Sequence, residues 1–179
     1  MANRIALREL QTRLATRLQA ARDQEQAVSW LAVESGASHY LFPLTQADEI
    51  FKRAPIQSVP YAHGWFVGVA NLRGGLFGVV DLARFIGPAK VQPAPAGAEP
   101  AVAGMRMITL NAALDVNCAV LIDRLAGLRG IDSFHASHEA PQGSPDYFGH
   151  QYVDADEVHW QELNLQSMVH SPRFLAIGA

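Results

Sequence analysis

Histidine is the residue type in this chain with the clearest capacity for metal chemistry. The sequence contains seven histidines, and His135 and His138 lie three residues apart with Glu139 beside them. On a helix this spacing would place both imidazole rings on one face, where they could bind zinc. The segment instead runs into a Pro-Gln-Gly sequence, and no third ligand follows at a suitable spacing. We interpret it as a loop, and a small metal-dependent hydrolase using the His135–His150 loop remains the alternative.

The other groups that could support catalysis also have simpler interpretations. Cys118 is the only cysteine and lies inside an apolar run, which predicts a buried small side chain rather than a nucleophile. Asp154, Asp156 and Glu157 form an acidic patch that lacks the longer ligand pattern of a calcium loop, so we expect a solvated turn. The sequence contains no nucleophile elbow, no phosphate-binding glycine loop and no zinc-protease motif. We therefore predict a protein that is not an enzyme and has no cofactor and no metal.

Three charged residues next to apolar runs are more informative. Arg73 stands between two such runs, Asp81 ends the second run, and Glu49 precedes Ile50 and Phe51. Charges this close to a hydrophobic core need partners, because burying an unpaired charge costs several kcal/mol. In one interpretation Arg73 pairs with Glu49 or Asp81 and only fixes a turn. In the other, the pair shapes a protein-binding surface, and the spacing does not decide between the two.

The elements that must position these residues are short β-strands. Residues 28–34 and 39–44 are separated by a Ser-Gly-Ala-Ser turn and are typical of a hairpin. The turn at Arg73-Gly74-Gly75 joins two apolar runs, and its glycines tolerate positive φ. Residues 45–54 suit an edge strand or a helix. Further strands or short helices are expected at 66–72, 76–82, 82–87, 105–111, 116–125, 126–134, 158–165 and 165–175.

Two segments differ from this β-like pattern. In residues 1–27, Leu7, Leu10, Leu14 and Leu18 recur at helical spacing among several arginines, which predicts an amphipathic helical extension. This stripe could pack on its own domain, bind a partner helix or a second copy, or lie on a membrane surface. Residues 88–104 are rich in Ala and Pro and predict a flexible connector between two β-rich parts.

Composition narrows the class of protein. The chain has 179 residues, 49% of them hydrophobic and 17% charged, which is sufficient for a folded core. It carries 14 Lys and Arg against 17 Asp and Glu, and the small number of lysines argues against a nucleic-acid partner. No segment suits a transmembrane helix, and the charged N-terminus lacks the apolar region of a signal peptide. We expect a soluble, cytoplasmic protein without direct membrane insertion.

The stretch 67-VGVANLRGGLFGVVDLARFIG-87 resembles the signature of the CheW-like coupling domain of bacterial chemotaxis systems. The segments 40-YLFPLTQADEIFK-52 and 107-MITLNAALDVNCAVLIDRLAGLRGI-131 are similar to further parts of that domain, as is the junction at Asn164. The likeness is greatest to the branch of the family that serves type IV pili and twitching motility. Two departures are Gly78, where the family often has Pro, and the polar residues 159–162, where the last strand is normally apolar.

The resemblance implies a mostly β fold of two intertwined five-stranded SH3-like barrels, accompanied by the N-terminal helix and short helices. The CheW-like domain would span 28–177, with a first barrel at about 28–87, the connector at 88–104 and a second barrel at about 105–177. It also implies an adaptor that couples the cytoplasmic tip of a chemoreceptor to the regulatory domain of a CheA-type histidine kinase. Such an adaptor would be recruited to membrane-associated receptor arrays. A receptor-binding scaffold that does not bind the kinase is a further alternative.

Family knowledge also implies where the partners bind. Glu49 and Arg73 fall where the family has a charged pair that is important for signalling contacts. The resemblance places Leu44 and Ala47 on the strand face that lines a receptor-binding groove between the barrels. The expected protein-binding residues are Leu44, Ala47, Glu49, Asn71, Arg73 and Gly74, of which Asn71 and Gly74 complete the turn that presents Arg73.

Overall fold

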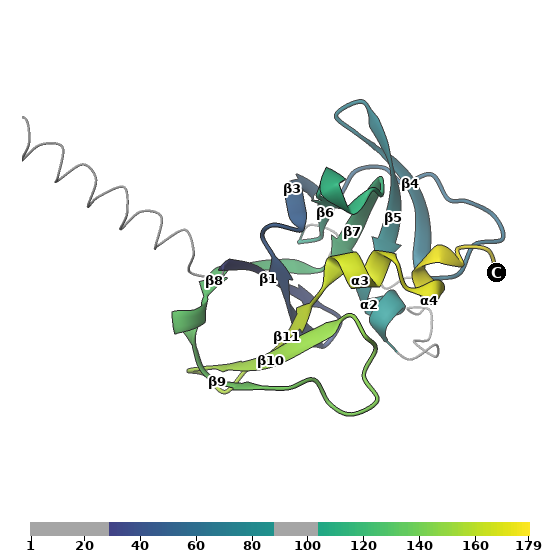
Figure 1. The fold of residues 1–179 in the computed structure, drawn as a ribbon. Helices are drawn as coiled ribbons and strands as arrows, with labels where there is room; N and C mark the ends of the chain where they lie inside the picture. The colour runs from purple at the N-terminus through teal and green to yellow at the C-terminus, as the bar shows by residue number, and fades with distance from the viewer. Residues whose placement is uncertain (1–28, 88–103) are drawn as a thin grey trace, which may run out of the picture.

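The computed structural model describes residues 29–87 and 104–179, which form two β-sheets with a few short helices (Figure 1). The helix expected over residues 1–27 lies outside the described residues, as does nearly all of the connector expected at 88–104. No helix among the described residues is long and apolar enough to cross a membrane.

One sheet has six strands in the order β8-β1-β2-β11-β10-β9, and the other has five in the order β3-β6-β7-β5-β4. The six-stranded sheet consists of β1 (Ser29–Ser35), β2 (Ser38–Pro43), β8 (Arg124–Gly130), β9 (Phe134–His138), β10 (Phe148–Asp154) and β11 (His159–Leu163). The five-stranded sheet consists of β3 (Ala47–Lys52), β4 (Phe66–Leu72), β5 (Gly75–Asp81), β6 (Arg106–Leu110) and β7 (Cys118–Ile122). The helices are α2 (Leu82–Ile86), α3 (Leu165–Val169) and α4 (Pro172–Leu175), with 3₁₀ turns η1 (Ala112–Leu114) and η2 (Ile131–Ser133).

The two sheets are interleaved along the chain. β1 and β2 join β8–β11 through the parallel pairing of β2 with β11, and β5 pairs in parallel with β7. Each sheet therefore takes strands from both sides of the connector, and a division of the chain at residues 88–104 does not separate the sheets. The expected mostly β, intertwined architecture is confirmed, although one sheet contains six strands rather than five.

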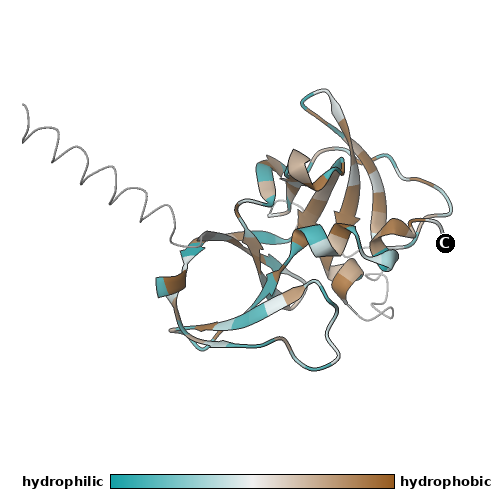
Figure 2. Ribbon diagram, in the orientation of Figure 1, coloured by the Kyte–Doolittle hydropathy of each residue, from teal (hydrophilic) through white to brown (hydrophobic). Residues whose placement is uncertain are grey.

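Several strands are buried on both faces, which explains their continuous apolar sequences. On β1, Trp30 and Ala32 face a cluster inside the six-stranded sheet, whereas Leu31 and Val33 face a larger core shared by both sheets. On β7, Ala119 faces a cluster inside the five-stranded sheet, while its neighbours on either side face the same shared core. Successive side chains of these two strands thus point alternately into two different cores. Figure 2 shows this hydrophobic character along the five-stranded sheet, whereas hydrophilic residues are frequent along β9–β11.

α2 and α4 attach to the shared core through aromatic side chains, whereas α3 packs through Leu165, Met168 and Val169. Phe85 of α2 is fully buried and contacts Trp65, Tyr147 and Phe174, with ring centroids 5.1–5.8 Å apart. Each helix begins at a capping side chain, which is Asp81 for α2, Asn164 for α3 and Ser171 for α4. The helices expected at 82–87 and 165–175 are present, the second as two separate turns.

The region between residues 134 and 154 differs from the sequence prediction. The segment expected as a loop over 135–150 contains most of β9 and the start of β10, and β10 was not expected at all. β9 is an exposed edge strand, so its sequence lacks the apolar alternation by which buried strands are found. Asp154 also differs from the predicted solvated turn, because it is only 4% exposed. Its carboxylate accepts hydrogen bonds from the backbone of Asp156 and Val158 and from the Trp160 indole.

The polar residues of β11 find partners inside the fold. The Trp160 indole donates to Asp154 at 2.8 Å, and the Gln161 amide donates to the Gly149 carbonyl at 2.9 Å. Glu162 accepts a 2.9 Å hydrogen bond from the Trp30 indole. Hydrogen bonding removes most of the cost of burying polar groups. The strand therefore packs although its sequence is polar.

Cys118 lies in the shared core and is 5% exposed, which confirms the prediction of a buried small side chain. Burial raises the pKa of its thiol to about 12. At about pH 8 the thiolate population should be on the order of a thousandfold lower than in the unfolded chain. We expect a thiol reagent such as Ellman's reagent to label the native protein very slowly and to label it rapidly in guanidinium chloride. Equal labelling rates in the two conditions would contradict the buried position.

Candidate protein-binding site

The site begins with the turn between β4 and β5. Leu72 pairs with Gly75, so only Arg73 and Gly74 lie in the loop, at φ 50° and 87°. Positive φ at both central residues is typical of the type I′ hairpin turn, whose twist matches that of the flanking strands. The Asn71 side-chain oxygen accepts a 2.9 Å hydrogen bond from the Gly74 amide. The turn expected at Asn71, Arg73 and Gly74 is therefore present as the two-residue loop Arg73-Gly74, closed by the Asn71 side chain.

The turn directs Arg73 toward β3. The Arg73 guanidinium donates to the Glu49 carboxylate at 2.7 Å and lies 5.5 Å from the centroid of the Phe51 ring. The side chains of Arg73 and Glu49 are 74% and 42% exposed, so a partner protein can reach both. β3 and β4 are the two outer strands of the five-stranded sheet. The ion pair therefore connects the two edges of the five-stranded sheet, and we call this junction between β3 and the β4–β5 turn the seam of the sheet.

Glu49 is fixed by its backbone more than by its side chain. Its amide donates to the Thr109 hydroxyl at 3.0 Å, and the hydroxyl donates back to the Glu49 carbonyl at 3.3 Å. The β3–β6 register shifts between Ala47 and Ile50, and the buried Thr109 hydroxyl satisfies the backbone at that irregularity. Among the residues that the structure describes, the buried Oε2 atom of Glu49 has no hydrogen-bond partner, and Arg73 is the one side chain that holds the carboxylate.

The structure decides between the two carboxylates that the sequence offered to Arg73. Glu49 is the partner, whereas Asp81 caps α2 through the Arg84 amide and forms a 3.2 Å ion pair with the Arg84 guanidinium. Burial raises the pKa of the Asp81 carboxyl, and its interactions with Arg84 act in the opposite direction. Asp81 thus serves the start of a helix and takes no part in the Arg73 pair.

The structure separates Leu44 from Ala47 in exposure. Leu44 lies in the β2–β3 turn and is 38% exposed, whereas Ala47 is 8% exposed and lies in the shared core. The turn is fastened to the β11–α3 junction, where the Leu165 amide donates to the Gln46 side chain at 2.7 Å. Leu44 is therefore available for contact, and Ala47 is not.

Two residues of the site, Phe51 and Thr109, were not among those predicted. Phe51 follows Glu49 by two positions, and on a strand this spacing places both side chains on the same face, so a signal was present. Thr109 lies far away in sequence, and nothing in its local pattern indicates that its hydroxyl meets Glu49. Only the pairing of β3 with β6 brings these two residues together.

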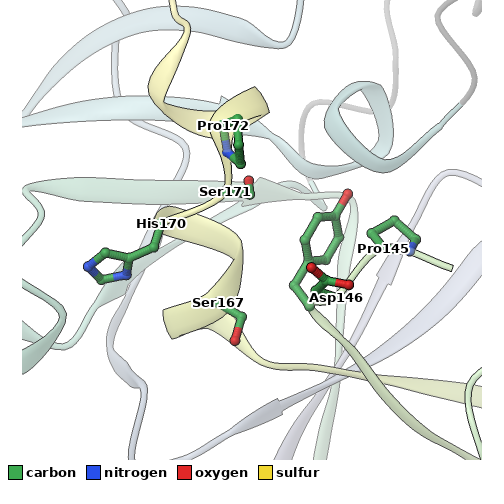
Figure 3. A pocket seen from close by; sticks show the side chains of 7 residues that line it. Pro145, Asp146, Ser167, His170, Ser171 and Pro172 are labelled. Atoms are coloured by element: carbon green, nitrogen blue, oxygen red, sulfur yellow. The ribbon is translucent and has the colours of Figure 1, made fainter.

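The histidines of the predicted loop, His135, His138 and His150, are all exposed. His135 lies 3.3 Å from Glu157 on the surface, and residues 29–87 and 104–179 contain no group of three or more metal-ligating side chains suited to an ion. A separate cavity of about 480 Å³ lies beside α3 and α4 (Figure 3). Its lining residues are Pro145, Asp146, Tyr147, Ser167, His170, Ser171 and Pro172. None of the predicted protein-binding residues lines this cavity.

Two known proteins are similar to this chain, one in sequence and one in fold. Protein PilI of Pseudomonas aeruginosa is 26% identical to this chain over 124 residues, which are 68% of this chain and 65% of PilI. The match thus spans slightly less than two thirds of that relative. The scaffolding protein TtCheW from Thermoanaerobacter tengcongensis has a similar fold, with a TM-score of 0.63 and 15% identity. The alignment covers 83% of this chain and 96% of TtCheW.

The family match covers both sheets and the candidate site. The CheW-like domain model matches residues 29–173, from the start of β1 into α4. This range includes the Arg73 turn, Glu49 and the β11–α3 junction. The match extends over more than half of the chain and agrees with the interleaved topology described above. The chain belongs to the CheW-like domain family.

Proposed function

We propose that this chain is a non-enzymatic adaptor that couples a chemoreceptor to a CheA-type histidine kinase. We further propose that it acts in a chemosensory system that controls type IV pili and twitching motility, on the basis of its similarity to PilI. The observation that carries the proposal is the exposed Arg73–Glu49 pair, which a rigid turn presents at the seam of the five-stranded sheet. The adaptor domain would span residues 28–177, with residues 1–27 as an extension.

The geometry suits recognition of a helical receptor tip. An amphipathic helix can place apolar side chains against Leu44 while its polar side chains meet the charges of Arg73 and Glu49. Asn71 and Gly74 keep the turn in one conformation, which reduces the ordering cost of binding. Ala47 supports the surface from the core. Contacts of this kind are often modest in area, which allows binding to depend on receptor state.

An adaptor needs no chemistry of its own. It must bind receptor and kinase at once, with affinities that differ between receptor states, because linkage then transmits the receptor state to the kinase. We place the protein in the cytoplasm, recruited to membrane-associated receptor arrays through the receptor tip. Nucleic acid is not an expected partner.

A three-component binding experiment tests the proposal. The full chain would be mixed with the host's receptor signalling fragment and with the regulatory domain of its kinase, and complexes would be separated by size-exclusion chromatography. We expect a complex that contains all three proteins, unchanged by a metal chelator. A complex with receptor alone would favour the scaffold alternative. Binding to neither folded partner would overturn the proposal.

A further inference from the structure

The Arg73 side chain is held from two directions. Its guanidinium donates to Glu49 at 2.7 Å and lies over the Phe51 ring at 5.5 Å from the centroid. Glu49 and Phe51 are two positions apart on β3, so their side chains lie on the same face of the strand, and both are half-buried. This face therefore supplies both a carboxylate and an aromatic ring to the Arg73 guanidinium. Phe51 in turn packs against the cluster inside the five-stranded sheet.

The ion pair alone would hold the Arg73 side chain only weakly. Exposed ion pairs contribute little free energy, because solvent screens the charges and long side chains lose rotamer freedom. The Arg73 side chain is 74% exposed, so its pair with Glu49 belongs to this weak class. A cation above an aromatic face gains a further attraction of comparable size. The Phe51 ring also blocks part of the space into which the arginine could otherwise turn.

The position of the Glu49 carboxylate depends on the arginine. The Glu49 backbone is anchored by Thr109, whereas its carboxylate has one partner, Arg73, and its second oxygen is buried without a donor. If Arg73 turns away, nothing else among the described contacts holds that carboxylate in place. The ring of Phe51 thus affects both charges of the pair.

We propose that Phe51 is a positioning residue that presets the Arg73–Glu49 pair in its binding orientation through the contact between its ring and the Arg73 guanidinium. This inference rests on the proposed function and goes beyond it by naming the side chain that orders the binding pair before the partner arrives. A preset side chain binds more tightly because less rotamer freedom is lost in the complex. The role requires an aromatic ring at this position rather than apolar bulk alone.

A double-mutant cycle with the full chain and the receptor signalling fragment tests the role. We expect Phe51→Leu to weaken binding about two- to fivefold, as the loss of an exposed cation–π contact would, and Phe51→Tyr to retain wild-type affinity. In an Arg73→Ala background, Phe51→Leu should change affinity less than about twofold, because the arginine it positions is absent. Phe77→Leu is the matched control, since Phe77 packs against the same cluster, and thermal unfolding would confirm that each variant folds.

Equal weakening by Phe51→Leu in both backgrounds would overturn the inference, because a merely structural role acts whether or not Arg73 is present. NMR provides a readout without any partner. The δ-methylene protons of Arg73 should show a ring-current shift that Phe51→Leu abolishes and Phe51→Tyr preserves. Absence of that shift in the wild-type chain would also overturn the inference. If the wild-type chain shows the shift but does not bind receptor, the proposed function fails while the Phe51–Arg73 contact stands.

Discussion

Arg73→Glu is expected to weaken binding to the receptor fragment at least tenfold while leaving the protein folded. The Arg73 guanidinium lies 2.7 Å from the Glu49 carboxylate, and the substitution replaces this cation with a negative charge, so it removes one contact and adds repulsion. Loss of a central arginine at a protein interface commonly costs about 2 kcal/mol or more of binding free energy. An exposed ion pair contributes only about 0–1 kcal/mol to folding, so the unfolding temperature should change little. Titration calorimetry and thermal unfolding measure the two effects.

Two further variants separate a binding role of Arg73 from a structural one. Arg124→Glu is the matched control, because the Arg124 side chain is similarly exposed, at 68%, and pairs with Glu34 on the six-stranded sheet, with an Nε–Oε2 distance of 2.8 Å. It should leave receptor affinity unchanged. The charge-swapped double variant, Glu49→Arg with Arg73→Glu, restores an ion pair but reverses its polarity. If the swap restores full affinity, the pair only fixes the turn. An unfolded Arg73→Glu protein would lead to the same conclusion.

Gly68→Ala is expected to destabilise the fold by about 2–4 kcal/mol, with a fall in melting temperature of roughly 5–15 °C. Gly68 has φ 138°, and a Cβ atom there would lie 2.1 Å from the Gln57 carbonyl oxygen. Gln57 and the neighbouring Val69 exchange two backbone hydrogen bonds of 2.8 and 2.9 Å. This exchange ties the chain after β3 to β4 and closes the five-stranded sheet. The alanine must therefore either strain the backbone or break the closure.

Gly64→Ala provides the control for this prediction. A Cβ at Gly64 would meet no atom within 4 Å, and the φ of Gly64 lies outside the left-handed region. The stability of the Gly64→Ala variant should therefore stay close to that of the wild-type chain. Denaturant unfolding of both variants measures the difference. If Gly68→Ala unfolds at the same denaturant concentration as Gly64→Ala, the close approach of Gln57 to β4 is not a feature of the protein in solution. We expect the closure to matter for function as well, because it holds the edges that Arg73 and Glu49 connect.

Local sequence was sufficient to predict the turn and most strands. The Asn-Leu-Arg-Gly-Gly segment contains both the side chain that caps the turn and the glycine that adopts positive φ, within four positions of one another. The doubly buried strands were visible as continuous apolar runs. β9 and β10 were missed because exposed edge positions, glycine and histidine interrupt their apolar pattern. The family resemblance added the location of the charged pair, which spacing alone left undecided.

By itself, then, the sequence determined the β-rich class, the positions of most strands and the turn that presents Arg73. These features depend on interactions between residues a few positions apart, and such interactions leave a local pattern. The tertiary structure decided between Glu49 and Asp81 as the partner of Arg73, which spacing left open, and it alone showed that Thr109 anchors Glu49 and that Phe51 lies beneath the guanidinium. These contacts join residues 22 to 60 positions apart in sequence. They form because the pairing of β3 with β6 and the closure at Gln57 bring the two ends of the five-stranded sheet together.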